Sequence, residues 1–309
     1  MLQVPKTVSL PEDKVTIVAT DSGLGGLSVV ADLERKLQSA CIFKKAHLVF
    51  FNALFSNESG YTQISSRDEK IRIFNNTLFS IEDNYSPDLL LIACNTLSTI
   101  YGDTDFAGKT GTPVVGIIEA GVEIIDAQLR KAPDTKVIIF ATETTISEDN
   151  HRKALIAAGI SPESIITQNC LNLAHHIDRT FDSKKTAELI SALVDEALAK
   201  LPSLDSPISV SLNCTHFGYC LGLWQKAFEK RGVKPIAFLN PNYVMTDFLF
   251  QPEKMNRFEK TDISVEVVSK IEIIHERKDA FNRFIESISP KTAEALANYK
   301  MKEDLFQWP

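Results

Sequence analysis

The chain has 309 residues, 44% of them hydrophobic, and its 40 acidic and 33 basic residues give a formal net charge of -7. This length allows two compact domains, while the acidic balance and the lack of a basic stripe exclude nucleic acid as a primary partner. No apolar run reaches the roughly 18 residues needed to span a bilayer, and the first residues lack the apolar segment of a signal peptide. We therefore expect no membrane partner and a cytoplasmic location.

Short apolar runs alternate with longer amphipathic segments from the start of the chain. The runs that predict buried strands span residues 15–20, 46–51, 88–93, 113–118, 136–141, 207–212 and 234–239. The segments that predict helices include residues 27–38, 66–84 and 184–200. This alternation is typical of an α/β fold with mainly parallel sheets flanked by helices.

Two later stretches add to this pattern. Thr145 and Glu148 have the spacing of a capping box, and Gly159 stands where the following helix would end. Beyond residue 239 the pattern is less regular, but residues 263–274 alternate as a strand does and residues 278–288 are helix-like. We expect this tail to pack back on the first domain.

The five cysteines are an odd set scattered along a chain without an export signal. This argues against a disulfide framework and favours reduced thiols, at Cys41, Cys94, Cys170, Cys214 and Cys220. Most buried thiols are inert, so a reactive thiol has to be inferred from its surroundings.

Two of these thiols stand in matching positions. Cys94 ends the apolar run 88–93 and is followed by Asn95 and Thr96, while Cys214 follows the run 207–212. A thiol between the carboxyl end of a parallel strand and a helix N-terminus meets exposed N–H groups and the positive end of the helix dipole. We expect these to lower the thiol pKa and make the sulfur a usable base or nucleophile. Each cysteine alone fits an inert buried role, but the matched pair favours a reactive one.

A third strand end carries polar residues and closely spaced glycines. The first run leads into Asp21 and Ser22, then Gly23, Gly25 and Gly26. Glycines allow the backbone to approach a small ligand, and Asp21 is placed to orient an ammonium group or to assist a thiol. The alternative is a plain strand-to-helix turn with a capping serine.

Nucleotide and metal motifs do not fit. Ser28 stands where a dinucleotide fingerprint needs its third glycine, and Gly102 and Gly108 are one residue too far apart for a P-loop. The cysteines and histidines lack the paired short spacings of structural zinc, in a set comprising Cys214, His216, Cys220, His175, His176 and Asp178. We expect neither a cofactor nor a metal, and we place His175 and His176 on a partly exposed helix.

Three segments together resemble the signature segments of glutamate racemases, within the aspartate/glutamate racemase superfamily. They are TDSGLGGLSV, IACNTLS and LNCTHFG, and PVVGIIEAGV and ATETTISE support them in the expected order. The resemblance reaches to about Leu239. It implies cofactor-independent inversion at an amino acid Cα, by two pseudo-symmetric α/β domains with the active site in the cleft between them. The expected domains are residues 1–118 with 243–309, and residues 119–242.

The resemblance also implies roles for individual residues. Cys94 and Cys214 would be the paired acid/base thiols, assisted by Asp21 and His216 respectively. The substrate would be held by Ser22, Asn95, Thr96, Thr142, Thr144, Thr145, Thr215 and Gly60. The implied partner is a small amino acid substrate, glutamate by default. The resemblance also implies a role for the protein in peptidoglycan biosynthesis. Members of this family often form homodimers.

Several positions depart from the family pattern. Where glutamate racemases carry an Arg and a Pro-Tyr-Gly element, this chain has Ser56 and then Glu58, Ser59 and Gly60. Asp178 replaces a Glu, and Asn240 and Pro241 stand where Asp-Ser is common. An acidic residue facing the cleft would disfavour a second substrate carboxylate.

Substrate choice therefore stays open. The alternatives are a relative acting on aspartate or another amino acid, one that isomerises or decarboxylates a small dicarboxylic acid, and an amino acid binding protein without turnover.

Overall fold

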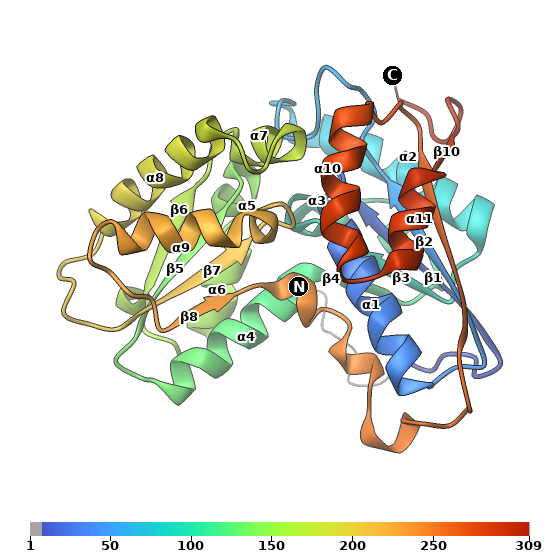
Figure 1. Cartoon of the computed structure of the whole chain (residues 1–309), viewed down its shortest axis with the longest axis horizontal. Helices are drawn as coiled ribbons and strands as arrows, with labels where there is room; N and C mark the ends of the chain where they lie inside the picture. The colour runs from blue at the N-terminus through green and yellow to red at the C-terminus, as the bar shows by residue number, and fades with distance from the viewer. Residues whose placement is uncertain (1–7, 309) are drawn as a thin grey trace. The chain divides into compact units, whose positions relative to one another are not determined.

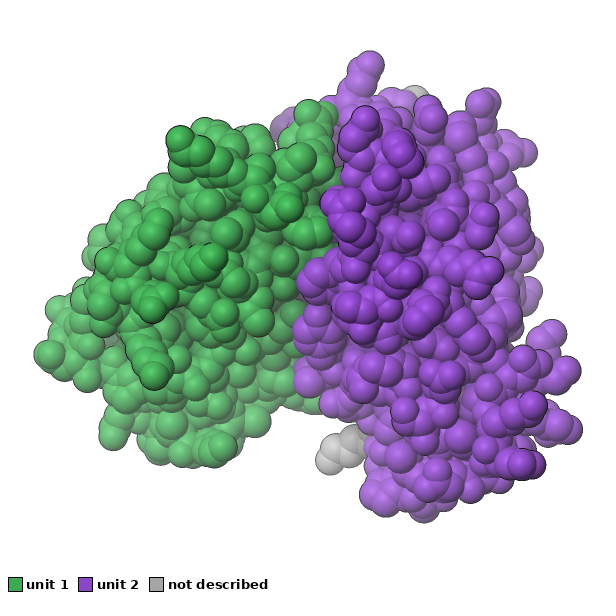
Figure 2. Space-filling view, viewed as in Figure 1, with its two compact units in different colours: residues 1, 118–241 green, residues 2–117, 242–309 purple. Residues whose placement is uncertain are grey.

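The computed structural model describes residues 8–308, which form two compact units (Figures 1 and 2). The Cys94 unit comprises the described residues up to Ile117 and from Asn242 onward. The Cys214 unit comprises Ile118–Pro241. Each unit has its own parallel sheet, so each is described by itself.

The Cys94 unit is built on a six-stranded parallel sheet in the order β10-β9-β2-β1-β3-β4. Its strands are β1 (Lys14–Asp21), β2 (Lys45–Asn52), β3 (Leu89–Ile92), β4 (Val114–Gly116), β9 (Asp262–Ser269) and β10 (Lys300–Met301). Its helices are α1 (Leu27–Ala40), α2 (Arg67–Tyr85), α3 (Asn95–Ile100), α10 (His275–Glu286) and α11 (Pro290–Ala297). Figure 1 shows α1, α10 and α11 together in front of this sheet and α2 behind it. With helices on both faces, the central strands are almost continuously apolar.

The Cys214 unit has a four-stranded parallel sheet in the order β6-β5-β7-β8. Its strands are β5 (Lys136–Ala141), β6 (Ile165–Asn169), β7 (Ile208–Asn213) and β8 (Ala237–Leu239). Its helices are α4 (Ile117–Lys131), α5 (Glu143–Glu148), α6 (Asn150–Ala157), α7 (Leu173–Arg179), α8 (Lys184–Leu198) and α9 (Leu221–Glu229). Short 3₁₀ turns complete the chain, at Tyr101–Asp103, Phe106–Gly108, Pro162–Ser164, Phe217–Cys220, Pro241–Tyr243, Asp247–Leu249 and Pro252–Lys254.

The α/β fold with parallel sheets is confirmed, and each of the seven predicted strands is present. The strand-like stretch from residue 263 forms β9, which pairs with β2, and the helix-like stretch after it forms α10. The sequence pattern did not indicate β6 or β10. Both are edge strands, and β10 has only two residues.

The predicted capping box is wrong. Thr145 lies inside α5, whose N-cap is Thr142, and its hydroxyl is 3.0 Å from the hydroxyl of Thr142. Asp149 then takes a left-handed backbone conformation, with φ of 57°, and divides the predicted helix into α5 and α6. The predicted end at Gly159 is confirmed, since its φ of +90° ends the helix.

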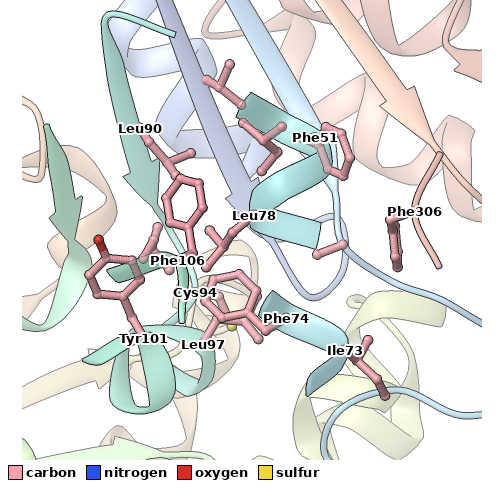
Figure 3. Packing of buried hydrophobic residues seen from close by; sticks show 14 of the residues in the cluster. Phe51, Ile73, Phe74, Leu78, Leu90, Cys94, Leu97, Tyr101, Phe106 and Phe306 are labelled. Atoms are coloured by element: carbon pink, nitrogen blue, oxygen red, sulfur yellow. The ribbon is translucent and has the colours of Figure 1, made fainter. Parts of the chain in front are cut away.

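An extensive buried cluster lies in the Cys94 unit between the sheet and α2. Figure 3 shows Phe51, Phe74, Leu78 and Leu97 in this cluster, with the Cys94 sulfur among them. Cys94 therefore belongs to an apolar core as well as to a strand end, which bears directly on its acidity.

We predict opposite effects on stability for two helical glycines. A Cβ on Gly121 in α4 would lie 2.7 Å from Asn213 Nδ2 and 3.0 Å from His151 Nε2, whereas a Cβ on Gly222 in α9 meets nothing within 4 Å. Gly121→Ala should lower the free energy of unfolding by about 1–3 kcal/mol. Gly222→Ala should leave it unchanged or raise it by up to about 1 kcal/mol. Urea denaturation of both variants checks this, and equal effects would contradict the predicted clash at Gly121.

Candidate active site

The candidate residues of the Cys94 unit, Asp21, Ser22 and Cys94, lie at the carboxyl edge of the six-stranded sheet, and we call them the first half-site. Asp21 is the last residue of β1, and Cys94 follows the neighbouring strand β3 as the N-cap of α3. The strands run parallel with Thr20 opposite Ile92, and the Ala93 N–H donates to the Thr20 carbonyl at 2.9 Å. This register brings Asp21 and Cys94 to the same edge, as the sequence predicted. Both are buried.

Ser22 connects the two groups. Its hydroxyl donates to Asp21 Oδ1 at 3.5 Å, and its Oγ lies 3.1 Å from Cys94 Sγ. Ser22 has one hydroxyl proton, so it accepts from the neutral thiol while it donates to the carboxylate, and it donates to the sulfur when the thiol is ionised. Ser22 is thus in place to pass a proton between Cys94 and Asp21. Its predicted contact with substrate stays a prediction.

The glycine loop after β1 closes on Asp21. The Gly26 N–H donates to Asp21 Oδ2 at 2.5 Å. A Cβ on Gly26 would lie 2.9 Å from the Cβ of Asp21 and 3.1 Å from that of Ala93. A side chain at Gly26 would therefore displace the carboxylate, which explains the glycine without reference to a nucleotide.

The acidity of Cys94 is opposite to the sequence-based expectation. Burial raises the pKa of its thiol to about 12, and the negative charge of Asp21 adds to the rise. Hydrogen bonds from Ser22 and from the Leu97 N–H only partly oppose this. The expectation of a lowered pKa considered the helix N-terminus alone, but α3 has only six residues and the thiol lies in an apolar core. Without substrate, Cys94 is a neutral thiol at physiological pH.

Asn95 and Thr96 open α3 as predicted, and both are buried. Within residues 8–308, neither Nδ2 nor Oδ1 of the Asn95 amide has a hydrogen-bond partner. An unsatisfied buried amide is costly, so such a group needs a partner, either ordered water or a ligand. A ligand that accepts from Nδ2 and donates to Oδ1 would satisfy it.

The loop that departs from the family pattern is closed by its own hydrogen bonds. The Glu58 N–H donates to Ser56 Oγ at 3.1 Å, and the Gly60 N–H donates to Gln63 Oε1 at 2.8 Å. Glu58 is exposed, while Gly60 is half-buried. The structure does not draw Gly60 together with Asp21 or Cys94 through any described contact, so its role in substrate binding is a prediction only.

The second half-site lies at the carboxyl edge of the four-stranded sheet. Cys214 follows β7, and Cys214, Thr215 and His216 are buried. Cys214 Sγ lies 3.9 Å from His216 Nδ1, and His216 Nε2 lies 2.9 Å from Asp178 Oδ1 on α7. A carboxylate, an imidazole and a thiol therefore form a continuous series, in which the carboxylate orients the ring.

Asp178 is a candidate site residue whose contact with His216 the sequence did not indicate. In the sequence it stands out only as a replacement for the family's Glu, and no side chain that it contacts could be predicted. The available signal was its place one turn from His175 in a short helix, but 38 positions separate it from His216. Only the fold brings these two side chains together.

The predicted threonines lie at the same edge. Ala141 at the end of β5 pairs with Asn213 at the end of β7, so Thr142 and Cys214 follow neighbouring strand ends. Thr142 and Thr145 are buried and share a hydrogen bond, while Thr144 is half-buried.

The remaining thiols and histidines have no described contact with Cys94 or Cys214. All five cysteines lie in the described part, and none of them forms a disulfide. Cys220 donates to the Phe181 carbonyl at 3.1 Å, and burial raises its pKa to about 12. His175 and His176 lie on α7, half-buried as predicted. Between residues 8 and 308, no three His, Cys, Asp or Glu side chains gather as metal ligands would.

A parallel α/β protein whose strand ends each present a buried thiol beside an acid/base partner has the groups required for proton transfer at carbon. The family model described as Asp/Glu/Hydantoin racemase matches residues 25–236. The chain therefore belongs to the Asp/Glu/hydantoin racemase family.

Similar proteins agree with this assignment. The chain is 26% identical over 197 residues to a glutamate racemase of Campylobacter jejuni, covering 64% of this chain and 71% of that protein. It is 25% identical over 198 residues to a glutamate racemase of Streptococcus gordonii, covering 64% and 67%. The structure resembles that of Francisella tularensis glutamate racemase in complex with D-glutamate, with a TM-score of 0.64, 21% identity and coverage of 89% and 95%. None of the helices described here is long and apolar enough to cross a membrane.

The raised pKa of Cys94 predicts slow alkylation that accelerates with pH. In the native protein, iodoacetamide should modify Cys94 slowly at about pH 7, with a rate still rising at about pH 10, because the thiolate fraction grows about tenfold per pH unit below the pKa. Asp21→Asn removes the nearby negative charge and should increase the rate at each pH. Peptide mass spectrometry measures both, with half-exposed Cys41 as the internal reference. A rate for Cys94 that levels off below about pH 9 would contradict the assignment.

Proposed function

We propose that this protein is a cofactor-independent amino acid racemase in which Cys94 and Cys214 exchange protons with the substrate Cα. The observation that carries the proposal is that each strand-end thiol has its own proton path to a carboxylate. Cys94 reaches Asp21 through Ser22, and Cys214 reaches Asp178 through His216. An inert buried thiol needs no acid/base partner, whereas both of these thiols have one.

The chemistry of inversion explains the need for two. A base must remove the proton from one face of Cα while an acid supplies a proton to the other, and one group cannot do both in a single pass. The Cα proton is very weakly acidic, so the developing negative charge needs fixed donors and exclusion of water. We assign the two faces to Cys94 and Cys214.

The proton balance in one direction follows from the paths. Cys94 passes its thiol proton to Ser22 as Ser22 passes its own to Asp21, and the resulting thiolate takes the Cα proton. Cys214 then gives its thiol proton to the opposite face and recovers one from His216, whose ring Asp178 holds. Asp21 is left with an extra proton and His216 is one proton short, so Asp21 returns its proton to water and His216 takes one from water before the next turnover. The reverse direction uses the same steps backwards. The raised pKa of Cys94 fits this scheme, because a neutral thiol needs an acceptor for its proton before its sulfur can act as a base.

The substrate is held by groups near each thiol. The unsatisfied amide of Asn95 is suited to the substrate's carboxylate and ammonium groups, because it offers both a donor and an acceptor. Thr96, Thr215 and the threonines after β5 are further donors at the same sheet edges.

Glutamate is the first candidate substrate, since the similar proteins are glutamate racemases. Glu58 is exposed, so its charge is screened by water and does not argue strongly against a second carboxylate. However, the chain has Ser56 where the family carries an Arg, so aspartate or another amino acid is the alternative.

The direct test is incubation of the purified protein with single amino acids in D2O, following deuterium at Cα. We expect exchange and inversion with one acidic amino acid. Exchange with none of them, together with calorimetric binding of one, would replace the racemase with a binding protein. Exchange with loss of carbon dioxide from a dicarboxylic acid would indicate the decarboxylase alternative.

The two-thiol assignment makes a sharper prediction. Cys94→Ser and Cys214→Ser should each abolish inversion, while one-sided exchange survives from one enantiomer only, and from opposite enantiomers in the two variants. Cys41→Ser, which changes a half-exposed thiol outside both half-sites, should keep full activity. Full inversion by either active-site variant would refute the assignment.

Asp178 should matter through His216. Asp178→Asn leaves a hydrogen-bond partner for the ring but removes the charge, and we expect kcat to fall by about 10²-fold with little change in KM. The pH profile should also shift, which a purely structural role would not produce. Unchanged kcat and pH profile would show that Asp178 only supports the fold.

A further inference from the structure

We propose that the last described residues, 305–308, position the loop between β2 and α2 and thereby control the surroundings of Cys94. We call residues 305–308 the C-terminal strap and residues 53–66 the β2–α2 loop. This loop contains the positions that depart from the family pattern. The inference rests on the proposed function only where it concerns substrate, because its main test reads the thiol itself.

The backbone of the strap and of the residues just before it is held at several points. The Lys302 N–H donates to the Ser269 carbonyl at 2.9 Å, which continues the pairing of β10 with β9. Farther along, Ser80 Oγ donates to the Leu305 carbonyl, and Asn76 Nδ2 donates to the Gln307 carbonyl at 3.2 Å. Asn76 and Ser80 are four residues apart and so lie on one face of α2. The strap therefore crosses α2 in a defined position.

The aromatic side chains of the strap pack just before the loop and near its start. Phe306 is buried against Phe51, with ring centroids 6.0 Å apart, and Figure 3 shows it with Phe51 at the side of the cluster that contains Cys94. Trp308 lies on Phe55, at 5.0 Å, and Phe55 meets Tyr61 edge-on at 5.3 Å. These contacts make a continuous aromatic series from the chain end to Tyr61.

The start of the loop is fixed to Asp21. Thr20 Oγ1 donates to the Phe51 carbonyl at 3.0 Å, and the Ala53 N–H donates to the Asp21 carbonyl at 2.8 Å. Asn52 pairs with Asp21 across the sheet and donates to Ser269 Oγ at 3.0 Å. The carbonyl of the same Ser269 accepts from the Lys302 N–H, shortly before the strap begins.

The other side of the loop reaches Cys94. Tyr61 is fully buried in the apolar cluster that contains Cys94, Phe55 and Phe306. Burial raises the pKa of the Tyr61 phenol, and the Cys94 thiol adds to this rise. Between these fixed ends, residues 56–60 have mainly the local hydrogen bonds described above. Their position therefore depends on the aromatic contacts at Phe55 and Tyr61, and through Phe55 on Trp308.

Trp308 is the residue at which to test the strap. It is 41% exposed, so its removal leaves no core cavity, whereas Phe306 is buried. Trp308→Ala should loosen the β2–α2 loop, admit water to Cys94 and speed its alkylation by iodoacetamide about tenfold, the change that one pKa unit produces. Cys214 and Cys170, in the other unit, should react at the wild-type rate.

Two controls separate positioning from general loss of stability. Phe281→Leu weakens the core under α10, in the same unit but on the face formed with α1 and α11. It should lower the urea midpoint without accelerating Cys94. In the Phe55→Leu background, Trp308→Ala should add little, since the two act through one contact. Wild-type alkylation in Trp308→Ala, equal acceleration in Phe281→Leu, or fully additive effects in the double variant would each overturn the proposal.

A kinetic measurement extends the test to the substrate. With the amino acid that the exchange panel identifies, Trp308→Ala should raise KM more than it lowers kcat, because the loop is misplaced while both thiols remain. A protein that exchanges no amino acid would refute the racemase but leave the alkylation test intact. Faster alkylation with unchanged KM would limit the strap to Cys94 and remove the β2–α2 loop from substrate selection.

Discussion

The parallel pairing of β1 with its neighbours is the constraint on which the Cys94 half-site depends. Parallel strands that share a register bring their last residues to one edge, so Asp21, Asn52 and the segment leading to Cys94 meet there. The Gly26 loop can then close on the carboxylate, and Ser22 comes between acid and thiol. A shift of one residue in β1 would turn Asp21 to the other face of the sheet and separate the pair.

Burial gives the two half-sites their chemical character. In the Cys94 unit the thiol belongs to an apolar cluster, and desolvation outweighs the hydrogen bonds that favour its ionised form. In the Cys214 unit the thiol lies beside an imidazole that a carboxylate orients. The two thiols thus reach their carboxylates through different groups, a hydroxyl and a ring, at equivalent places on two separate sheets. The two thiols occupy similar positions because each follows a strand of a parallel sheet. Their surroundings differ because Ser22 lies between Cys94 and its carboxylate, whereas His216 lies between Cys214 and its carboxylate.

The strands and both strand-end thiols could be predicted because the signals are local. An apolar run of strand length followed by Cys94 or Cys214 and small polar residues identifies the edge without knowledge of the partners. The capping box failed because the helix begins earlier, with Thr142 as the N-cap of α5, and Asp149 then adopts a left-handed conformation that ends α5. The acidity of Cys94 was predicted with the wrong sign, since desolvation depends on side chains such as Phe74 that are distant in sequence.

The amino-acid sequence alone determined the alternation of strands and helices, the parallel class of the sheets and the residues that end each strand, because hydrophobic period and turn residues act over a few positions. The sequence could not predict that Asp178 contacts His216, that Ser22 lies between Asp21 and Cys94, or that Trp308 packs on Phe55 in the β2–α2 loop. Those relations join residues 38, 72 and more than 200 positions apart, and chain folding alone brings them within hydrogen-bonding or van der Waals distance.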